Sequence, residues 1–203
     1  MTSQRPSRSR LFEIASEQRG YFNSKQAHEA GYSTDLIKHH VKRGNFNRIR
    51  RGLYRLHPYP TAPDDHVVEA WLEAGPKAVV SHESALAVHR LSDVVPSKVH
   101  VTVPRSYRMV VSRVPRGINV HTTEKPLTSD QIVKRGALRV TTPARSIIDA
   151  AEAGTAPEQI ILAIQQALRE GITTRKELQR LAAARSKRVL KLVTAGIQEA
   201  QTA

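Results

Sequence analysis

The chain has 203 residues, enough for one or two domains, and its 39% hydrophobic and 25% charged residues are typical of a folded protein. It carries 32 Lys and Arg against 18 Asp and Glu, a formal net charge of +14. Residues 1–60 hold 12 basic and four acidic residues, so the surplus is concentrated at the start. Such a charge favours a polyanion partner, although it also fits a solvated surface.

Features that are missing from the sequence exclude several classes of protein. There is no cysteine, which excludes disulfide bonds and thiolate metal sites. The first ten residues lack the apolar core of a signal peptide, and no run of 18 apolar residues could cross a bilayer. We therefore expect a cytoplasmic protein with no membrane partner.

Three short helices are predicted near the start of the chain. Asn23 or Ser24 can cap the second helix, and Ser33 can cap the third. Gly31 and Gly44 follow the second and third helices, where a left-handed residue commonly ends a helix. The three helices are predicted over residues 9–18, 25–30 and 33–43.

A β-hairpin is predicted directly after the third helix, over residues 46–56, with its turn at Arg51 and Gly52. Successive residues of a strand point to opposite faces, so Phe46 and Ile49 cannot share the buried face without a bulge. The sequence therefore predicts the hairpin but leaves its register open.

Three prolines between residues 58 and 63 indicate a linker, and we expect a domain boundary near residue 60. Residues 1–60 form the first domain, in which residues 1–8 are expected to be a flexible basic arm. Residues 61–203 form the second domain. Its predicted helices lie at residues 64–75, 81–91, 144–154, 157–171, 173–184 and 190–200. Its predicted strands lie at residues 97–104, 117–123 and 138–143. The first two strands flank a basic loop that contains Arg105, Arg108, Arg113 and Arg116.

Three short helices followed by an arginine-rich hairpin predict a winged helix-turn-helix, in which the third helix enters the major groove of DNA. The predicted fold class is therefore α+β and mostly helical: an N-terminal winged helix-turn-helix, then a helix-rich domain with a small β-sheet. Polar side chains on the third helix can reach base edges, and wing arginines can bind phosphates. The candidate DNA-binding residues are Ser33, Thr34, Lys38, His39, Lys42 and Arg43 of the helix and Arg48, Arg50, Arg51 and Arg55 of the wing.

The segment GYFNSKQAHEAGYSTDLIKHHVKRGNFNRIRRGLYRL resembles the N-terminal domain of AbiEi-type antitoxins of bacterial toxin-antitoxin systems. VVSHESALAVHRLSD, VHVTVPR and LRVTTPARSIIDAA are similar to the pattern that follows in those proteins, so the resemblance covers about residues 8–155. It implies a repressor that binds inverted repeats in its own promoter, with two copies on the DNA. It also implies that the second domain neutralises a co-encoded nucleotidyltransferase-like toxin, directly or indirectly, with no cofactor.

Other interpretations were weighed against this one. A DNA-directed metal nuclease would need a ligand set, and the best local group is His82, Glu83 and His89. On one helix the two histidines would lie about 10 Å apart, too far to share a metal, so we expect no enzyme and no metal site. A regulator without a toxin partner is a further alternative. The seven basic residues within 171–203 could extend the DNA footprint, contact a protein or remain solvated.

Overall fold

The computed structural model describes residues 5–107 and 117–202, except for the side chain of Thr202. The chain divides into two compact units, Met1–Gly75 with Gly136–Leu138, and Pro76–Arg135 with Arg139–Ala203. The division lies after the helix that follows the proline-rich linker, whereas the sequence places the boundary near residue 60. Each unit is described separately below.

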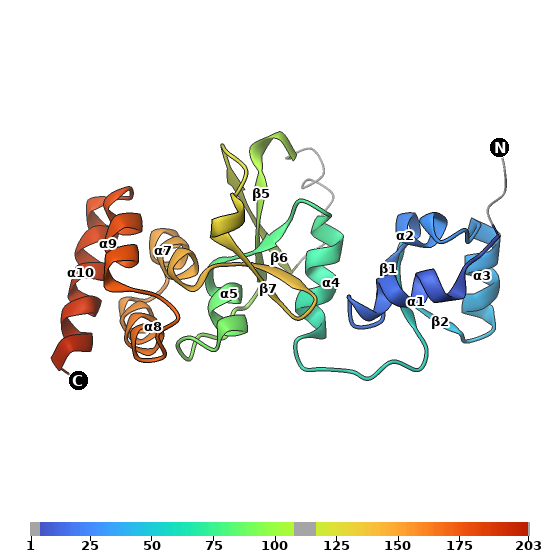
Figure 1. The fold of residues 1–203 in the computed structure, drawn as a ribbon, viewed down its shortest axis with the longest axis horizontal. Helices are drawn as coiled ribbons and strands as arrows, with labels where there is room; N and C mark the ends of the chain where they lie inside the picture. The colour runs from blue at the N-terminus through green and yellow to red at the C-terminus, as the bar shows by residue number, and fades with distance from the viewer. Residues whose placement is uncertain (1–4, 108–116, 203) are drawn as a thin grey trace. The chain divides into compact units, whose positions relative to one another are not determined.

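The first unit combines four helices with a small antiparallel sheet (Figure 1). In the sheet β3 lies between β1 and β2. Its elements are α1 (Arg8–Ser16), β1 (Tyr21–Asn23), α2 (Ser24–Glu29), α3 (Thr34–Lys42), β2 (Phe46–Arg50), β3 (Leu53–Leu56) and α4 (Asp65–Ala74). The three predicted helices and the hairpin are thus confirmed within one or two residues of their predicted bounds. Strand β1, which the sequence analysis did not predict, has only three residues.

The helices of the first unit begin at the predicted caps. Asn23 Oδ1 accepts a hydrogen bond from the Gln26 backbone N–H, and the Asn23 backbone N–H donates one to Gln26 Oε1, which forms a complete capping box. Ser33 accepts from Leu36 N at 3.2 Å and caps α3. The core beneath them is formed by aromatic, aliphatic and alanine side chains of α1, β1, α2, α3 and β2: Leu11, Ala15, Phe22, Ala27, Ala30, Tyr32, Ile37 and Phe46.

The hairpin contains a β-bulge, which fixes the register that the sequence left open. Phe46 pairs with Leu56 and Arg48 with Tyr54, but Arg50 pairs with Leu53, so the register shifts at Ile49. The shift lets Phe46 be buried while Ile49 is half-buried. Gly52 completes the two-residue turn at a φ of 80°, a left-handed conformation in which glycine has no steric cost.

The second unit is a five-stranded mixed sheet with the strand order β6-β5-β4-β8-β7 and a layer of helices beside it (Figure 1). Strands β5 and β6 run parallel, as do β4 and β8, whereas β4 and β5 are antiparallel. The elements are β4 (Val79–Val80), α5 (His82–His89), β5 (Val99–Pro104), η1 (Arg105–Tyr107), β6 (Ile118–Thr123), η2 (Ser129–Gln131), β7 (Ile132–Arg135), β8 (Leu138–Thr141), α7 (Pro143–Ala153), α8 (Pro157–Arg169), α9 (Arg175–Ala183) and α10 (Lys187–Thr202).

Aliphatic residues of α5, α7, α8, α9 and α10 share one core in the second unit. Leu86, Ile147, Ile160, Leu178 and Val193 are each fully buried within it. Every helix and strand predicted for residues 76–203 is present, but the sheet also contains β4 and β7, which were not predicted. The mixed α+β fold class is confirmed. Of the predicted basic loop, Arg105 lies in η1, and Arg108, Arg113 and Arg116 lie outside the described residues.

No helix in the described part of the chain is long and apolar enough to span a membrane.

Candidate nucleic-acid interface

Helix α3 separates its apolar residues from its polar ones. Ile37 is fully buried, and Leu36 and Val41 pack against the same core. The residues proposed to contact bases or phosphates, Thr34, Lys38, His39, Lys42 and Arg43, are all exposed. The major groove of B-DNA is wide enough to admit such a helix, so this face has the chemistry and the accessibility for base contacts.

The charged side chains of α3 form only weak ion pairs within the described part of the protein. Lys38 binds Asp35 at 3.0 Å, but the two side chains are 68% and 91% exposed, and such a pair contributes little free energy. Lys38 can therefore exchange this partner for DNA. Desolvation and the nearby charges of His39 and Arg8 lower the pKa of His40. Ser33 is exposed, but its hydroxyl already caps the helix.

The arginines of the hairpin fall into two groups. Arg48 and Arg51 are exposed, and no carboxylate in the described part of the chain forms an ion pair with either. Arg50 is also partly exposed, but it binds Glu73 of α4 at 3.2 Å. Burial raises the pKa of Glu73, and Arg50 opposes that shift. Arg48 and Arg51 are therefore the hairpin cations that are free to bind phosphate.

Arg55 is an internal residue of the first unit. Its side chain is 8% exposed and binds Asp65 at 2.9 Å, and its guanidinium lies 4.7 Å from the centre of the Tyr21 ring. It also donates to the carbonyl of Pro60 at 2.6 Å. A side chain with these partners cannot reach DNA without breaking a buried ion pair. The structure therefore gives Arg55 a structural role, unlike the role predicted from the sequence.

The start of α4 belongs to the same ionic network. Arg19 binds Asp64 through two nitrogens and lies 3.7 Å from Asp65. The Asp64 side chain makes no cap hydrogen bond at the start of α4, and both of its oxygens accept hydrogen bonds from Arg19. Burial acts to raise the pKa of Asp64, but the hydrogen bond and charge of Arg19 outweigh it and lower that pKa. Sequence reasoning missed Arg19, which precedes a strand too short to be recognised.

The local histidine group weighed for a nuclease does not come together. His89 faces the carbonyl oxygen of Thr141 at 2.7 Å, and Glu83 accepts a hydrogen bond from Thr155 at 2.8 Å. These contacts hold α5 against β8 and α7, which is a structural role. Within the described residues His82, Glu83 and His89 form no shared ligand group, whereas His82 lies close to two other histidines.

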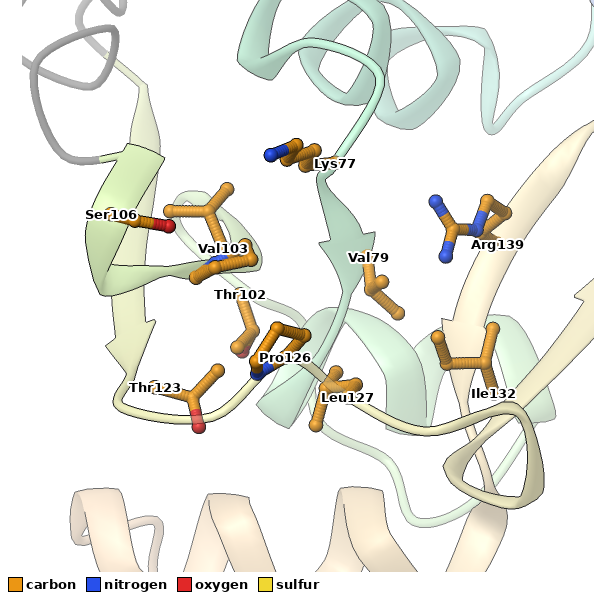
Figure 2. A pocket seen from close by; sticks show the side chains of 11 residues that line it. Lys77, Val79, Thr102, Val103, Ser106, Thr123, Pro126, Leu127, Ile132 and Arg139 are labelled. Carbon is orange, nitrogen blue, oxygen red and sulfur yellow. The ribbon is translucent and has the colours of Figure 1, made fainter.

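A cavity of about 250 Å³ lies in the second unit, and Figure 2 shows the side chains that line it. Val79, Val103 and Leu127 give it apolar walls, and Lys77 and Arg139 are its charged side chains. The described residues that line it include no carboxylate and no histidine.

Comparison with known proteins bears on both units. Residues 9–57 match the model of a family described as "Transcriptional regulator, AbiEi antitoxin". The matched segment holds α3 and the hairpin and covers about a quarter of the chain. The match confirms the resemblance for this segment, and it indicates a DNA-binding regulator of the toxin-antitoxin type. No protein with a curated description matched the sequence.

The fold of the whole chain has a counterpart among solved structures. The crystal structure of the RV2827C protein from Mycobacterium tuberculosis superposes with a TM-score of 0.61 at 12% sequence identity. The alignment covers 95% of this chain and 76% of that one. At this identity the comparison concerns the fold alone.

Proposed function

We propose that the first unit is a winged helix-turn-helix that binds double-stranded DNA, with α3 in the major groove and the β2–β3 hairpin as the wing. The observation that carries this proposal is the arrangement of side chains in one small unit. The apolar sides of α3 and the hairpin form the core, while Lys42, Arg43, Arg48 and Arg51 are exposed and unpaired among the described residues. Phosphates are the partners that such cations bind.

The biological role follows from the family match. We propose a transcriptional autorepressor that binds inverted repeats in its own promoter as two copies. We also propose an antitoxin that neutralises a co-encoded nucleotidyltransferase-like toxin through residues 61–203. Neither role requires catalysis. The match to an antitoxin family over residues 9–57 supports the regulator, and the resemblance of VVSHESALAVHRLSD and LRVTTPARSIIDAA supports the second domain.

A mobility-shift titration of the full chain with its own upstream DNA tests operator binding. The competitor is an unrelated duplex of equal length at moderate salt, because phosphate contacts alone bind all sequences alike. We expect the upstream duplex to bind at least about 1,000-fold more tightly than the competitor, the lower end for specific DNA-binding proteins. Equal affinity for both duplexes would refute the operator assignment.

Substitutions in α3 and in the wing should have different effects. Lys38→Ala or Lys42→Ala should change which operator variants bind best, because these side chains face the bases in the proposed complex. Arg48→Ala or Arg51→Ala should weaken all sequences by a similar factor, because phosphates carry no sequence information. Binding of a panel of single-base operator variants measures both effects, and the opposite pattern would exchange the two roles.

Neutralisation is tested with the full chain co-expressed with the neighbouring toxin gene product. The variant with Arg48→Ala and Arg51→Ala should lose repression of a promoter reporter yet still restore growth. The same variant losing both functions, while folded, would mean that neutralisation depends on DNA binding and not on the second domain.

A further inference from the structure

Three histidines meet at one end of the sheet in the second unit. His82 is the first residue of α5, His100 lies in β5 and His121 in β6. One ring nitrogen of each lies within 4.8 Å of the other two. His121 Nε2 is 3.1 Å from His100 Nδ1, and the rings of His82 and His121 stack with their centres 3.5 Å apart.

We propose that His82, His100 and His121 bind a divalent transition-metal ion of the zinc class. Two nitrogens bound to one tetrahedral zinc at about 2.0–2.1 Å lie roughly 3.3 Å apart. The His100 and His121 nitrogens lie 3.1 Å apart, where they share a hydrogen bond that the ion would replace. The His82 ring stacks on that of His121 at an interplanar angle of 15°, so these rings must turn before all three nitrogens can point at one ion. Neutral imidazole is a preferred ligand of zinc, cobalt, nickel and copper, so the donor set selects these ions over magnesium or calcium.

The surroundings of His82 resemble those of a metal ligand. Its Nδ1 lies 2.8 Å from the hydroxyl of Ser81, which also accepts a hydrogen bond from Thr102. Metal-bound histidines commonly donate their second nitrogen to such a group, which leaves Nε2 free for the ion. His82 also has a φ of 54°, a left-handed conformation that is uncommon outside glycine and tends to occur at functional sites.

The protonation state of the cluster favours metal binding. Burial, with the charges of neighbouring groups, lowers the pKa of His82 to about 2 and that of His121 to about 4. Burial also lowers the pKa of His100. Burial thus disfavours the protonated form of each ring, and neutral imidazole is the form that binds a metal.

The cluster is accessible and its electrostatic environment is mixed. His82 and His121 line a cavity of about 760 Å³, from which water can complete the coordination. Arg145 and Arg185 also line this cavity, and both bind Asp149 at 2.7 Å, so that carboxylate offsets part of their charge. A site with three protein ligands and one open position is typical of accessible zinc sites.

The test uses the untagged full chain, treated with EDTA and transferred to chelator-free buffer. Titration with Zn²⁺ by calorimetry should give one ion per chain, and Co²⁺ should show the visible absorption of a tetrahedral nitrogen site. At 100 times the dissociation constant, Zn²⁺ should raise the melting temperature by about 5–10 °C. Absence of Zn²⁺ and Co²⁺ binding by the folded wild type would overturn the proposal.

Variants locate the site. His121→Asn and His100→Asn should each weaken Zn²⁺ binding at least about 100-fold, and Ser81→Ala by about 10-fold, because it removes only the group that orients His82. The matched control is His66→Asn, a change at an exposed histidine of the first unit, which should bind like the wild type. Should a ligand variant fail to fold by circular dichroism, Ser81→Ala decides the assignment. Unchanged binding in folded His100→Asn and His121→Asn would refute it.

Discussion

Replacement of Arg48 and Arg51 by alanine is the sharpest test of the proposed DNA interface. Both side chains are exposed, and neither forms an ion pair within the described residues. Their removal therefore takes away two cations without leaving an unpaired carboxylate behind. Arg50 is unsuitable for the same purpose, because its loss would also release Glu73 from an ion pair.

The size of the effect follows from counterion release. Each phosphate contact contributes about 0.9 to the slope of the logarithm of the binding constant against the logarithm of salt concentration. Loss of two contacts should thus reduce the slope by about 1.8. If the two affinities converge near 1 M salt, the variant binds about 200-fold more weakly at 50 mM and about 20-fold more weakly at 200 mM.

Fluorescence anisotropy with a labelled upstream duplex, measured at several salt concentrations, gives both slopes. The matched control is Arg175→Ala with Lys176→Ala in α9, which removes the same charge from exposed positions of the second unit. The control should bind nearly as the wild type does. An unchanged slope in the hairpin variant would refute the phosphate contacts. An equal loss in the control would show that overall charge, and not the hairpin, determines affinity.

Two predictions concern the stability of the first unit, which the fluorescence of Trp71, the one tryptophan of the chain, reports during denaturation. Arg55→Ala should lower the free energy of unfolding by about 3 kcal/mol or more, because it leaves a buried carboxylate without its partner; a loss below about 1 kcal/mol would contradict the structural role. Gly44 has a left-handed conformation with open space around it, so Gly44→Ala should lower the free energy of unfolding by roughly 1–2 kcal/mol, the cost of that conformation for alanine. Gly20→Ala should lower it by more, because the new Cβ would also overlap the Tyr59 ring. Equal losses in the two glycine variants would contradict this reasoning.

The helices could be predicted because their signals are local. Asn23 and Gln26 lie three residues apart and form the capping box within that distance, and Pro157 stands at the first turn of α8. Each signal acts within one turn of helix, so a short stretch of sequence contains all of it. The hairpin bulge was also deducible, since Phe46 and Ile49 cannot otherwise share a face.

The short strands depend on partners that are distant in the chain. β4 consists of Val79 and Val80, and its parallel partner β8 begins more than 50 residues later. Two valines have no period that a sequence pattern could detect. The histidine cluster was missed for the same reason. Its members come from α5, β5 and β6, and only the parallel pairing of β5 with β6 sets His100 close to His121.

The hairpin arginines show how position and partner, more than residue type, determine what a charge does. Arg51 and Arg55 lie four residues apart and look equally suited to a wing. Arg51 is in the turn, and its side chain is exposed to solvent. Arg55 is in the central strand of the sheet, where it forms an ion pair with Asp65 and packs on the Tyr21 ring. Asp65 lies beyond the proline-rich linker, so the sequence alone could not assign it to Arg55. The hairpin charge available to DNA is therefore smaller than its count of arginines suggests, and among the described residues it lies at Arg48 and Arg51.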